Sequence, residues 1–203
     1  MQSEQTLWIA IQLHNFPYIC NKFNLIKVRN LINYIPSIFK KKEKAPDFLI
    51  QLNENRGLLW EKINHLKEAM SNVEGAIHRR TEECEKEFPL KHHFDGGLYT
   101  RELFLPKGSV IVSLIHKQAH PSFVLEGLVT VLDDSGEIKD LKAGDKVFTE
   151  IGAQRVVYAK EDSRWCCVYK TNKTNVEEAE DEVFTEDYLD LPKSVIKKYM
   201  LKK

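Results

Sequence analysis

From Leu98 to Lys170, apolar and polar residues alternate in short runs. In "GLYTRELFL", the residues Tyr99, Arg101, Leu103 and Leu105 fall on one face of an extended chain. Comparable apolar runs follow: "SVIVSLIH", "SFVLEGLVTVL", "KVFTEIG", "QRVVYA" and "RWCCVYK". The turn sequences "DDSGE", "KAGD" and "AKEDS" separate them. A succession of short strands without helices between them predicts a closed antiparallel β-barrel or a sandwich. The preceding "KHHFDGG" is interpreted as an exposed loop that leads into the barrel.

Before residue 88 the periodicity is helical. A helix is predicted from Asn53 to Glu87, because apolar residues recur at three- and four-residue steps, at Leu58, Leu59, Ile63, Leu66, Met70 and Val73. The segment "FNLIKVRNLINYIPSIF" has a similar stripe, and the basic "KKKEK" after it is typical of a linker. The stripe fits a helix packed on its own domain or on a second subunit, and it also fits a membrane surface.

The fold class expected is therefore α+β, with an antiparallel barrel of the jelly-roll kind after an α-helical N-terminal region. The expected units are a helical extension over residues 1–88, a barrel over 89–172 and an acidic tail over 173–203. In the tail, "EEAEDEVFTEDYLD" has little apolar area to offset its ordering entropy, so we expect it to be mobile. The final "SVIKKYMLKK" predicts a short helix.

Composition narrows the function classes. The chain has 203 residues with 30 basic and 30 acidic side chains, so no global field attracts nucleic acid. No run approaches the ~20 apolar residues of a transmembrane helix, and no signal peptide is evident. The four cysteines lack metal-binding spacing, which indicates free thiols in a reducing cytoplasm. Because Cys166 and Cys167 have no adjacent His in the sequence, a thiol nucleophile is not favoured. No phosphate-binding loop or serine nucleophile motif is present.

The segment "PKGSVIVSLIHKQAHPSFVLEGLVTVLDDSGEIKDLKAGDKVFTEIGAQR" resembles the small-barrel cupins, most specifically in "VLEGLVTVL" and "LKAGDKVFTEIGAQR". The stretch "HHFDGGLYTREL" before it is similar to cupin-like proteins often carried by bacteriophages and prophages. The resemblance implies a divalent metal, held in that family by two His and a Glu of a first motif and one His of a second. Position by position, His116 takes the place of the second His and His120 that of the Glu. Leu114 and Arg155 stand where the other two His ligands would be.

The spacing of His116 and His120 decides whether they can meet. On one unbroken strand they would lie ~13 Å apart, at ~3.3 Å per residue. A helix would bring them together, but Pro121 and the Val/Ile alternation oppose one. A turn at "KQA" remains, with one imidazole ending a strand and the other beginning the next. The resemblance implies the same arrangement, with a divalent ion such as Fe, Mn, Zn or Ni at His116 and His120.

Two imidazoles leave such an ion short of ligands, and a guanidinium at Arg155 would repel it and favour an anion. The alternative is a metal-free pocket for a carboxylate, a phosphate or a nucleotide-like ligand. Arg101 needs a carboxylate or a ligand if its face is inward, and otherwise lies on the surface. The candidate ligand-binding residues are Arg155, Gln118, Tyr158, Arg101 and Tyr99, with Tyr169 as a further hydroxyl.

Three functions stay open from the sequence. The first is a cupin-like binding protein that holds a small polar or anionic ligand, with or without a metal. The second is a metal-dependent cupin enzyme of the dioxygenase or isomerase type. The third is a phage-encoded structural or host-interaction protein that uses the barrel as a scaffold. The apolar content before residue 80 predicts a homo-oligomer, because one small barrel cannot easily cover it.

Overall fold

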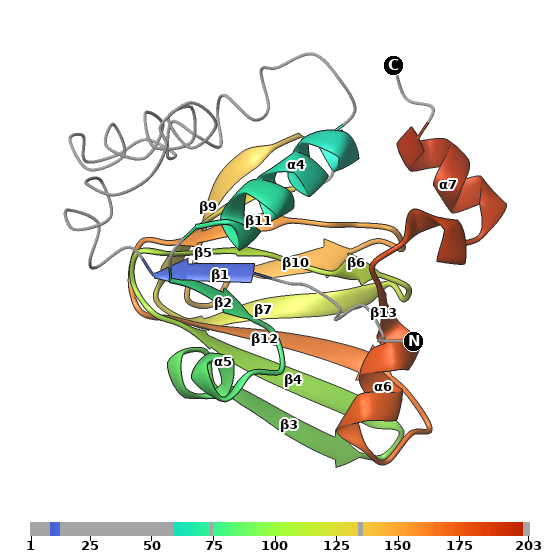
Figure 1. Cartoon of the computed structure of the whole chain (residues 1–203). Helices are drawn as coiled ribbons and strands as arrows, with labels where there is room; N and C mark the ends of the chain where they lie inside the picture. Colours follow the sequence, from blue (N-terminus) through green and yellow to red (C-terminus); the bar gives the residue numbers. More distant parts are fainter. Residues whose placement is uncertain (1–8, 13–58, 74, 134–135, 201–203) are drawn as a thin grey trace.

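The computed structural model describes residues 9–12, 59–73, 75–133 and 136–200. Their architecture is mostly antiparallel β-sheet with a few helices (Figure 1). The first sheet has, in spatial order, β2 (Ala76–His78), β1 (Ile9–Gln12), β5 (Ser109–Val112), β11 (Val156–Ala159), β8 (Leu128–Leu132) and β9 (Ile138–Lys142). The second has β10 (Lys146–Thr149), β7 (His120–Glu126), β12 (Ser163–Lys170), β4 (Leu98–Leu105) and β3 (Leu90–Asp95). A small third sheet pairs β13 (Phe184–Thr185) with β6 (Ile115–His116).

The alternating pattern between 98 and 170 correctly predicts the antiparallel strands, but a closed barrel is wrong. Among the described residues, no strand of the first sheet pairs with a strand of the second. The turn after Lys142, where Asp145 N donates to the Lys142 carbonyl at 2.9 Å, sends β9 and β10 into different sheets. The result is two facing sheets in the manner of a jelly roll, with apolar side chains from both between them.

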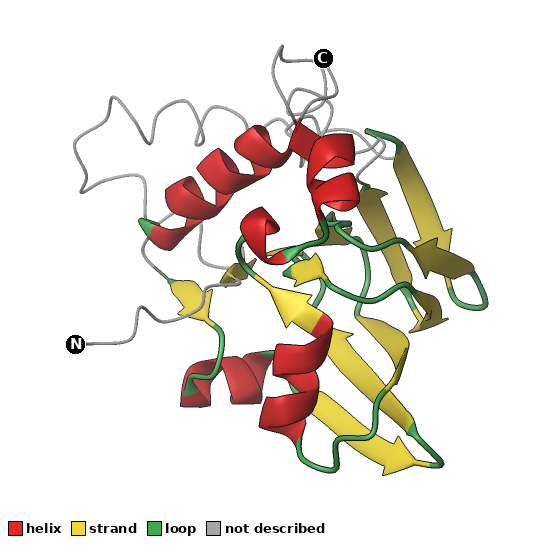
Figure 2. Cartoon of the chain, turned by 90° about the vertical axis from the view of Figure 1, so that its right-hand side faces the viewer, coloured by secondary structure: helices red, strands yellow, loops and turns green. Residues whose placement is uncertain are grey.

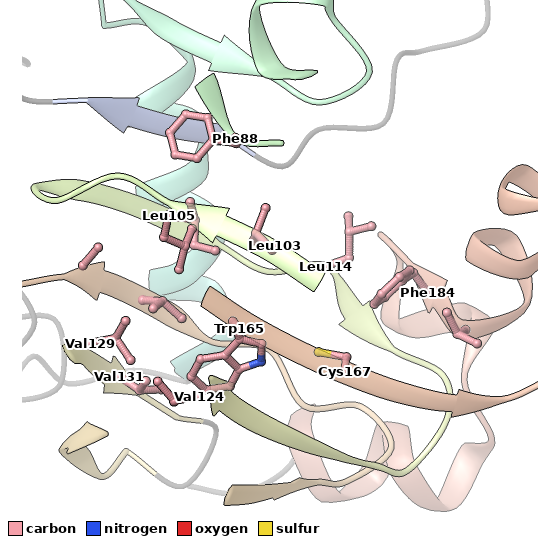
Figure 3. Packing of buried hydrophobic residues seen from close by; sticks show 14 of the residues in the cluster. Phe88, Leu103, Leu105, Leu114, Val124, Val129, Val131, Trp165, Cys167 and Phe184 are labelled. Carbon is pink, nitrogen blue, oxygen red and sulfur yellow. The ribbon is translucent and has the colours of Figure 1, made fainter. Parts of the chain in front are cut away.

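Side chains from both sheets form the main core. Figure 3 shows Leu103, Leu114, Trp165, Cys167 and Phe184 among the residues of this cluster. The alternation along β12 explains the inward set, because Trp165 and Cys167 are buried while Cys166 between them is half-buried.

A second core lies under α4 (Leu59–Ser71), which covers the outer face of the first sheet (Figure 1). Ile63 and Met70 of α4 pack there with Val110 and Val112 of β5. Ile111, between the two valines, belongs to the main core instead. Strand β5 is therefore buried on both faces, which explains why its sequence is apolar without alternation.

The N-terminal helical region differs from the expectation where it can be compared. The helix α4 ends at Ser71, and β2 and then α5 (Glu82–Glu87) follow instead of one helix to Glu87. Residues Ile9–Gln12, expected within the helical extension, form β1 between β2 and β5. Both strands extend the edge of the first sheet, where backbone pairing outweighs local helical spacing. The stripe over 23–35, which fitted packing on a second subunit, and the basic segment over 40–44, interpreted as a linker, lie outside the described residues.

The acidic segment is a second difference, because it is ordered. Asn175 caps α6 (Val176–Val183) by accepting a hydrogen bond from Glu178 N at 2.9 Å. Ala179 and Val183 of this helix are buried in the main core. The short helices η3 (Tyr188–Asp190) and α7 (Lys193–Met200) follow, so the final helix is confirmed. Figure 2 shows these C-terminal helices beside the strands.

The segment "KHHFDGG" is a third difference. Most of it forms β3, which pairs with β4 from Leu90↔Leu103 to Asp95↔Leu98, so it is an edge strand and not a loop. Along β3, half-buried and exposed residues alternate strictly. In the part of the chain that the structure describes, no helix has the length and apolar character needed to cross a membrane.

Candidate functional site

The turn expected between the two histidines is present. Strand β6 ends at His116, the chain turns over residues 117–119, and β7 begins at His120. Both imidazoles are buried, and their ring centroids lie 4.7 Å apart. The ring of Tyr169 from β12 lies 4.1 Å from His120, and its hydroxyl is 3.3 Å from His116 Nδ1. Three strands thus bring three polar rings into one buried cluster.

The environment of His116 keeps its ring neutral. Burial lowers the pKa of His116 well below its usual value, and the nearby His120, Arg155 and Arg101 lower it further. The C-terminal segment covers the ring from another side, because Phe184 of β13 pairs with His116 and the two rings are 5.3 Å apart.

Arg155 is the most unusual charge of the site. Arg155 is only 5% exposed, and its Nη1 donates a hydrogen bond to Thr149 Oγ1 at 2.6 Å. Its Nε is buried and has no hydrogen-bond partner among the described residues, and no carboxylate of that part of the chain lies within ion-pair distance. A buried guanidinium without a counter-charge is costly, so this position favours an anion from outside the described residues.

Arg155 and His116 line a cavity of about 70 Å³ between the sheets. Its walls are mostly apolar and include Leu103, Trp165 and Phe184. Its polar part comes from His116, Arg155, Arg101, Ser113 and Cys167. His120 lies beside this cavity without lining it. Apolar walls with a few convergent polar groups are typical of a small-ligand site.

Arg101 lies on the inward face of β4 and has a protein carboxylate as its partner. Its Nε donates to Glu180 Oε1 of α6 at 3.2 Å, and Arg79 pairs with the same carboxylate. The side chains of Arg79 and Glu180 are 5% and 6% exposed. Burial raises the pKa of Glu180, but Arg101 and Arg79 outweigh it, so that the pKa lies below its usual value. Glu180 therefore supplies the counter-charge that the sequence reasoning required for an inward Arg101.

The other expected ligand-binding residues do not reach the cavity. Gln118 lies at the turn but is tied to the backbone of Lys170, donating to its carbonyl and accepting from its N–H, both at 2.9 Å. Tyr158 packs against the outer core beneath α4. Tyr99 is fully buried in the main core, where its hydroxyl is 2.7 Å from His92 Nδ1.

Among the described residues, no group of three or more His, Cys, Asp or Glu side chains is placed to hold a metal ion. His120 Nδ1 is also taken up by the Gln118 carbonyl at 3.0 Å, and Arg155 adds positive charge nearby. The side chains present therefore do not fit the divalent ion that the sequence resemblance implies, and no chemistry is derived from one.

Sequence reasoning missed Cys167, Glu180 and Arg79. For Cys167 the signal existed, because the period of two in "RWCCVYK" places it on the face of Trp165 and Tyr169. The absence of an adjacent His in the sequence was misleading, since β7 brings His120 to it from a distant part of the chain.

No family model matches the sequence, and no curated protein matches it. Among solved structures, KdgF from Halomonas sp. is 19% identical, with 43% of this chain and 82% of that chain covered and a TM-score of 0.38. Ectoine synthase from P. lautus is 14% identical over 50% of this chain and 79% of that chain, with a TM-score of 0.41. A cupin-2 domain containing protein from Shewanella frigidimarina is 12% identical over 40% and 78%, with a TM-score of 0.34. Cupin-superfamily proteins are thus among the structures that this chain is similar to. At these TM-scores the likenesses carry no inference about ligand, metal or activity.

Proposed function

We propose that the protein is a cupin-like binding protein that holds a small carboxylate in the cavity lined by His116 and Arg155. The observation that carries the proposal is the buried guanidinium of Arg155, which has an unpaired Nε and no carboxylate partner among the described residues. A ligand carboxylate would supply both the missing acceptor and the missing charge. The apolar walls would enclose a short hydrocarbon part of the ligand.

The two arginines at the cavity have different roles in this proposal. Arg101 is already compensated by Glu180, so it contributes shape and a weak field. Arg155 offers the free donor, with Thr149 holding one of its nitrogens in place. His116 is neutral and can donate or accept one hydrogen bond to the ligand.

Binding is tested by titration calorimetry of the full chain with formate, acetate, propionate and butyrate, and with inorganic phosphate for comparison. We expect a short carboxylate to bind and Arg155→Gln to abolish the binding signal. The control is Arg164→Gln, which changes an arginine that pairs with Glu102 and Glu126 outside the cavity. Binding that survives Arg155→Gln, or no binding of any of these anions, would overturn the proposal.

Stability adds an independent readout. Because the unpaired guanidinium destabilises the empty protein, Arg155→Gln should leave its thermal stability unchanged or raise it. A large loss of stability would instead show that Arg155 has a structural role. Metal analysis of the purified chain belongs to the same test, since a stoichiometric ion lost in a His116→Ala, His120→Ala double variant would favour the metal-dependent enzyme. A phage-encoded scaffold role depends on the N-terminal segment, most of which lies outside the described residues.

A further inference from the structure

A buried chain of polar atoms connects Cys167 with the guanidinium of Arg155. Cys167 Sγ is 3.4 Å from Ser122 Oγ of β7. That hydroxyl is 3.5 Å from Thr149 Oγ1 of β10, which accepts from Arg155 Nη1 at 2.6 Å. All four residues are buried, and Cys167 and Arg155 both line the cavity. The thiol is therefore part of a polar network that lines a cavity, unlike an ordinary core cysteine.

His120 has one ring nitrogen fixed and the other free. Its Nδ1 is 3.0 Å from the carbonyl oxygen of Gln118. Because a carbonyl only accepts hydrogen bonds, Nδ1 carries the proton and Nε2 holds a lone pair. The residue is 4% exposed, and its Nε2 is buried without a hydrogen-bond partner of good geometry among the described residues. The backbone of the turn thus orients this imidazole as a base.

His120 and Cys167 lie on the same inward face of neighbouring strands, because Cys167 pairs with Ser122 and His120 is two residues before Ser122 on β7. Burial raises the pKa of the Cys167 thiol, but its contact with His120, the hydroxyl of Ser122 and the charge of Arg101 together lower the pKa to about 7. The two side chains are diagonal neighbours on β7 and β12, and no hydrogen bond joins them in the described part of the chain. Tyr169, two residues further along β12, lies on the same buried face as Cys167.

The adjacent Cys166 provides an internal contrast. It points to the opposite face of β12, as alternation requires. Burial and the neighbouring Cys167 and Glu102 raise its pKa to about 11. Two consecutive thiols of one strand therefore differ in environment, and they cannot form a disulfide with each other across the strand.

We propose that Cys167 is a nucleophilic thiol, with His120 as its base, that reacts with a small hydroperoxide entering the cavity. The thiol proton moves to His120 Nε2, and the sulfur attacks the terminal peroxide oxygen. A sulfur–oxygen bond forms and the oxygen–oxygen bond breaks, so that the sulfur is oxidised to a sulfenic acid and the peroxide is reduced. The leaving oxygen takes the proton back from His120 and departs as water or an alcohol. The guanidinium of Arg155 faces the same cavity and stabilises the negative charge that develops on that oxygen.

The size of the cavity supports a small hydroperoxide as the reactant. A volume of about 70 Å³ has room for hydrogen peroxide or a short alkyl hydroperoxide. The inference goes beyond carboxylate binding and does not depend on it, because the thiol and its base belong to strands β12 and β7 irrespective of a ligand.

The test is a competition between cysteines of the same molecule. The full-length protein is exposed to hydrogen peroxide at pH 7 with a sulfenic-acid trapping reagent, and each cysteine peptide is quantified by mass spectrometry. At this pH a thiol with a pKa near 7 is about half ionised, and one with a pKa near 11 is ionised to about 1 part in 10⁴. After the lower intrinsic nucleophilicity of the more acidic thiol is included, Cys167 should react about 100-fold faster than Cys166.

Two variants separate the parts of the proposal. His120→Gln should slow the labelling of Cys167 at least about tenfold at pH 7 and move the rise of its pH–rate profile to higher pH. Cys166→Ser is the matched control and should leave the Cys167 rate unchanged. Equal or faster labelling of Cys166 would overturn the assignment, and this comparison uses the unaltered protein, so it does not depend on whether a variant folds. An unchanged rate in a folded His120→Gln protein would remove His120 as the base.

Discussion

Replacing Glu180 by Gln should cause a large loss of stability. The substitution keeps the shape of the side chain but leaves Arg79 and Arg101, whose side chains are 5% and 12% exposed, without their shared counter-charge. Removing one partner of a buried ion pair costs about 3–5 kcal/mol. For a chain of this length each kcal/mol lowers the melting temperature by about 2–4 °C, so we expect a decrease of roughly 6–20 °C.

Urea unfolding followed by circular dichroism measures this difference directly. The matched control is Glu177→Gln on the same helix, since Glu177 is exposed and its substitution should change stability little. Acid adds a second readout. Because the pKa of Glu180 is below its usual value in the folded state, its stabilising contribution is present above the unfolded pKa and is lost as the pH falls through the folded pKa. A loss below about 1 kcal/mol in Glu180→Gln would mean that water reaches both guanidinium groups, and the argument from burial would be wrong.

Two further predictions concern His116 and the turn glycines. Burial lowers the pKa of His116 below 6.5, so below that pH the unfolded chain binds more protons than the folded protein. As the pH is lowered from about 6.5 to 5, the free energy of unfolding should therefore fall, by at most about 1.4 kcal/mol per pH unit from this group. His116→Gln should flatten this part of a stability–pH curve. Gly127→Ala should destabilise clearly more than Gly144→Ala in thermal melts. Both have positive φ, but only at Gly127 would the new Cβ lie 2.2 Å from the Asp162 carbonyl oxygen, so equal losses would contradict the clash.

The positions of His116 and His120 could be reasoned from the sequence because local rules settled them. Pro121 and the flanking Val/Ile alternation exclude a helix, and the distance along one strand excludes a shared site, which leaves a turn. The alternation of β4 placed Arg101 on the face of Leu103 and Leu105, but the sequence left open whether that face is inward or on the surface. The sequence could not indicate which backbone groups the side chains of the turn would bond to. Gln118 was expected at the cavity for this reason, but it bonds to the backbone of Lys170.

The acidic helix was misjudged because its charge was weighed before its spacing. Val176, Ala179 and Val183 recur at steps of three and four residues, and this narrow stripe is sufficient to dock α6. No local pattern could have indicated that Glu180 meets Arg79 and Arg101, because such pairings depend on the tertiary arrangement of the sheets. For the same reason, Cys167 was judged without the histidine that the fold places beside it.

The contribution of the C-terminal segment to the cavity has a consequence for the order of folding. Arg79 and Glu180 are 101 residues apart, and Phe184 of β13 pairs with His116 of β6. Contacts of such long sequence separation form late, since their loop-closure entropy is offset only when the intervening strands are in place. On the ribosome, both large sheets can be synthesised before β13 emerges, so the hollow beside His116 is completed among the last events of maturation.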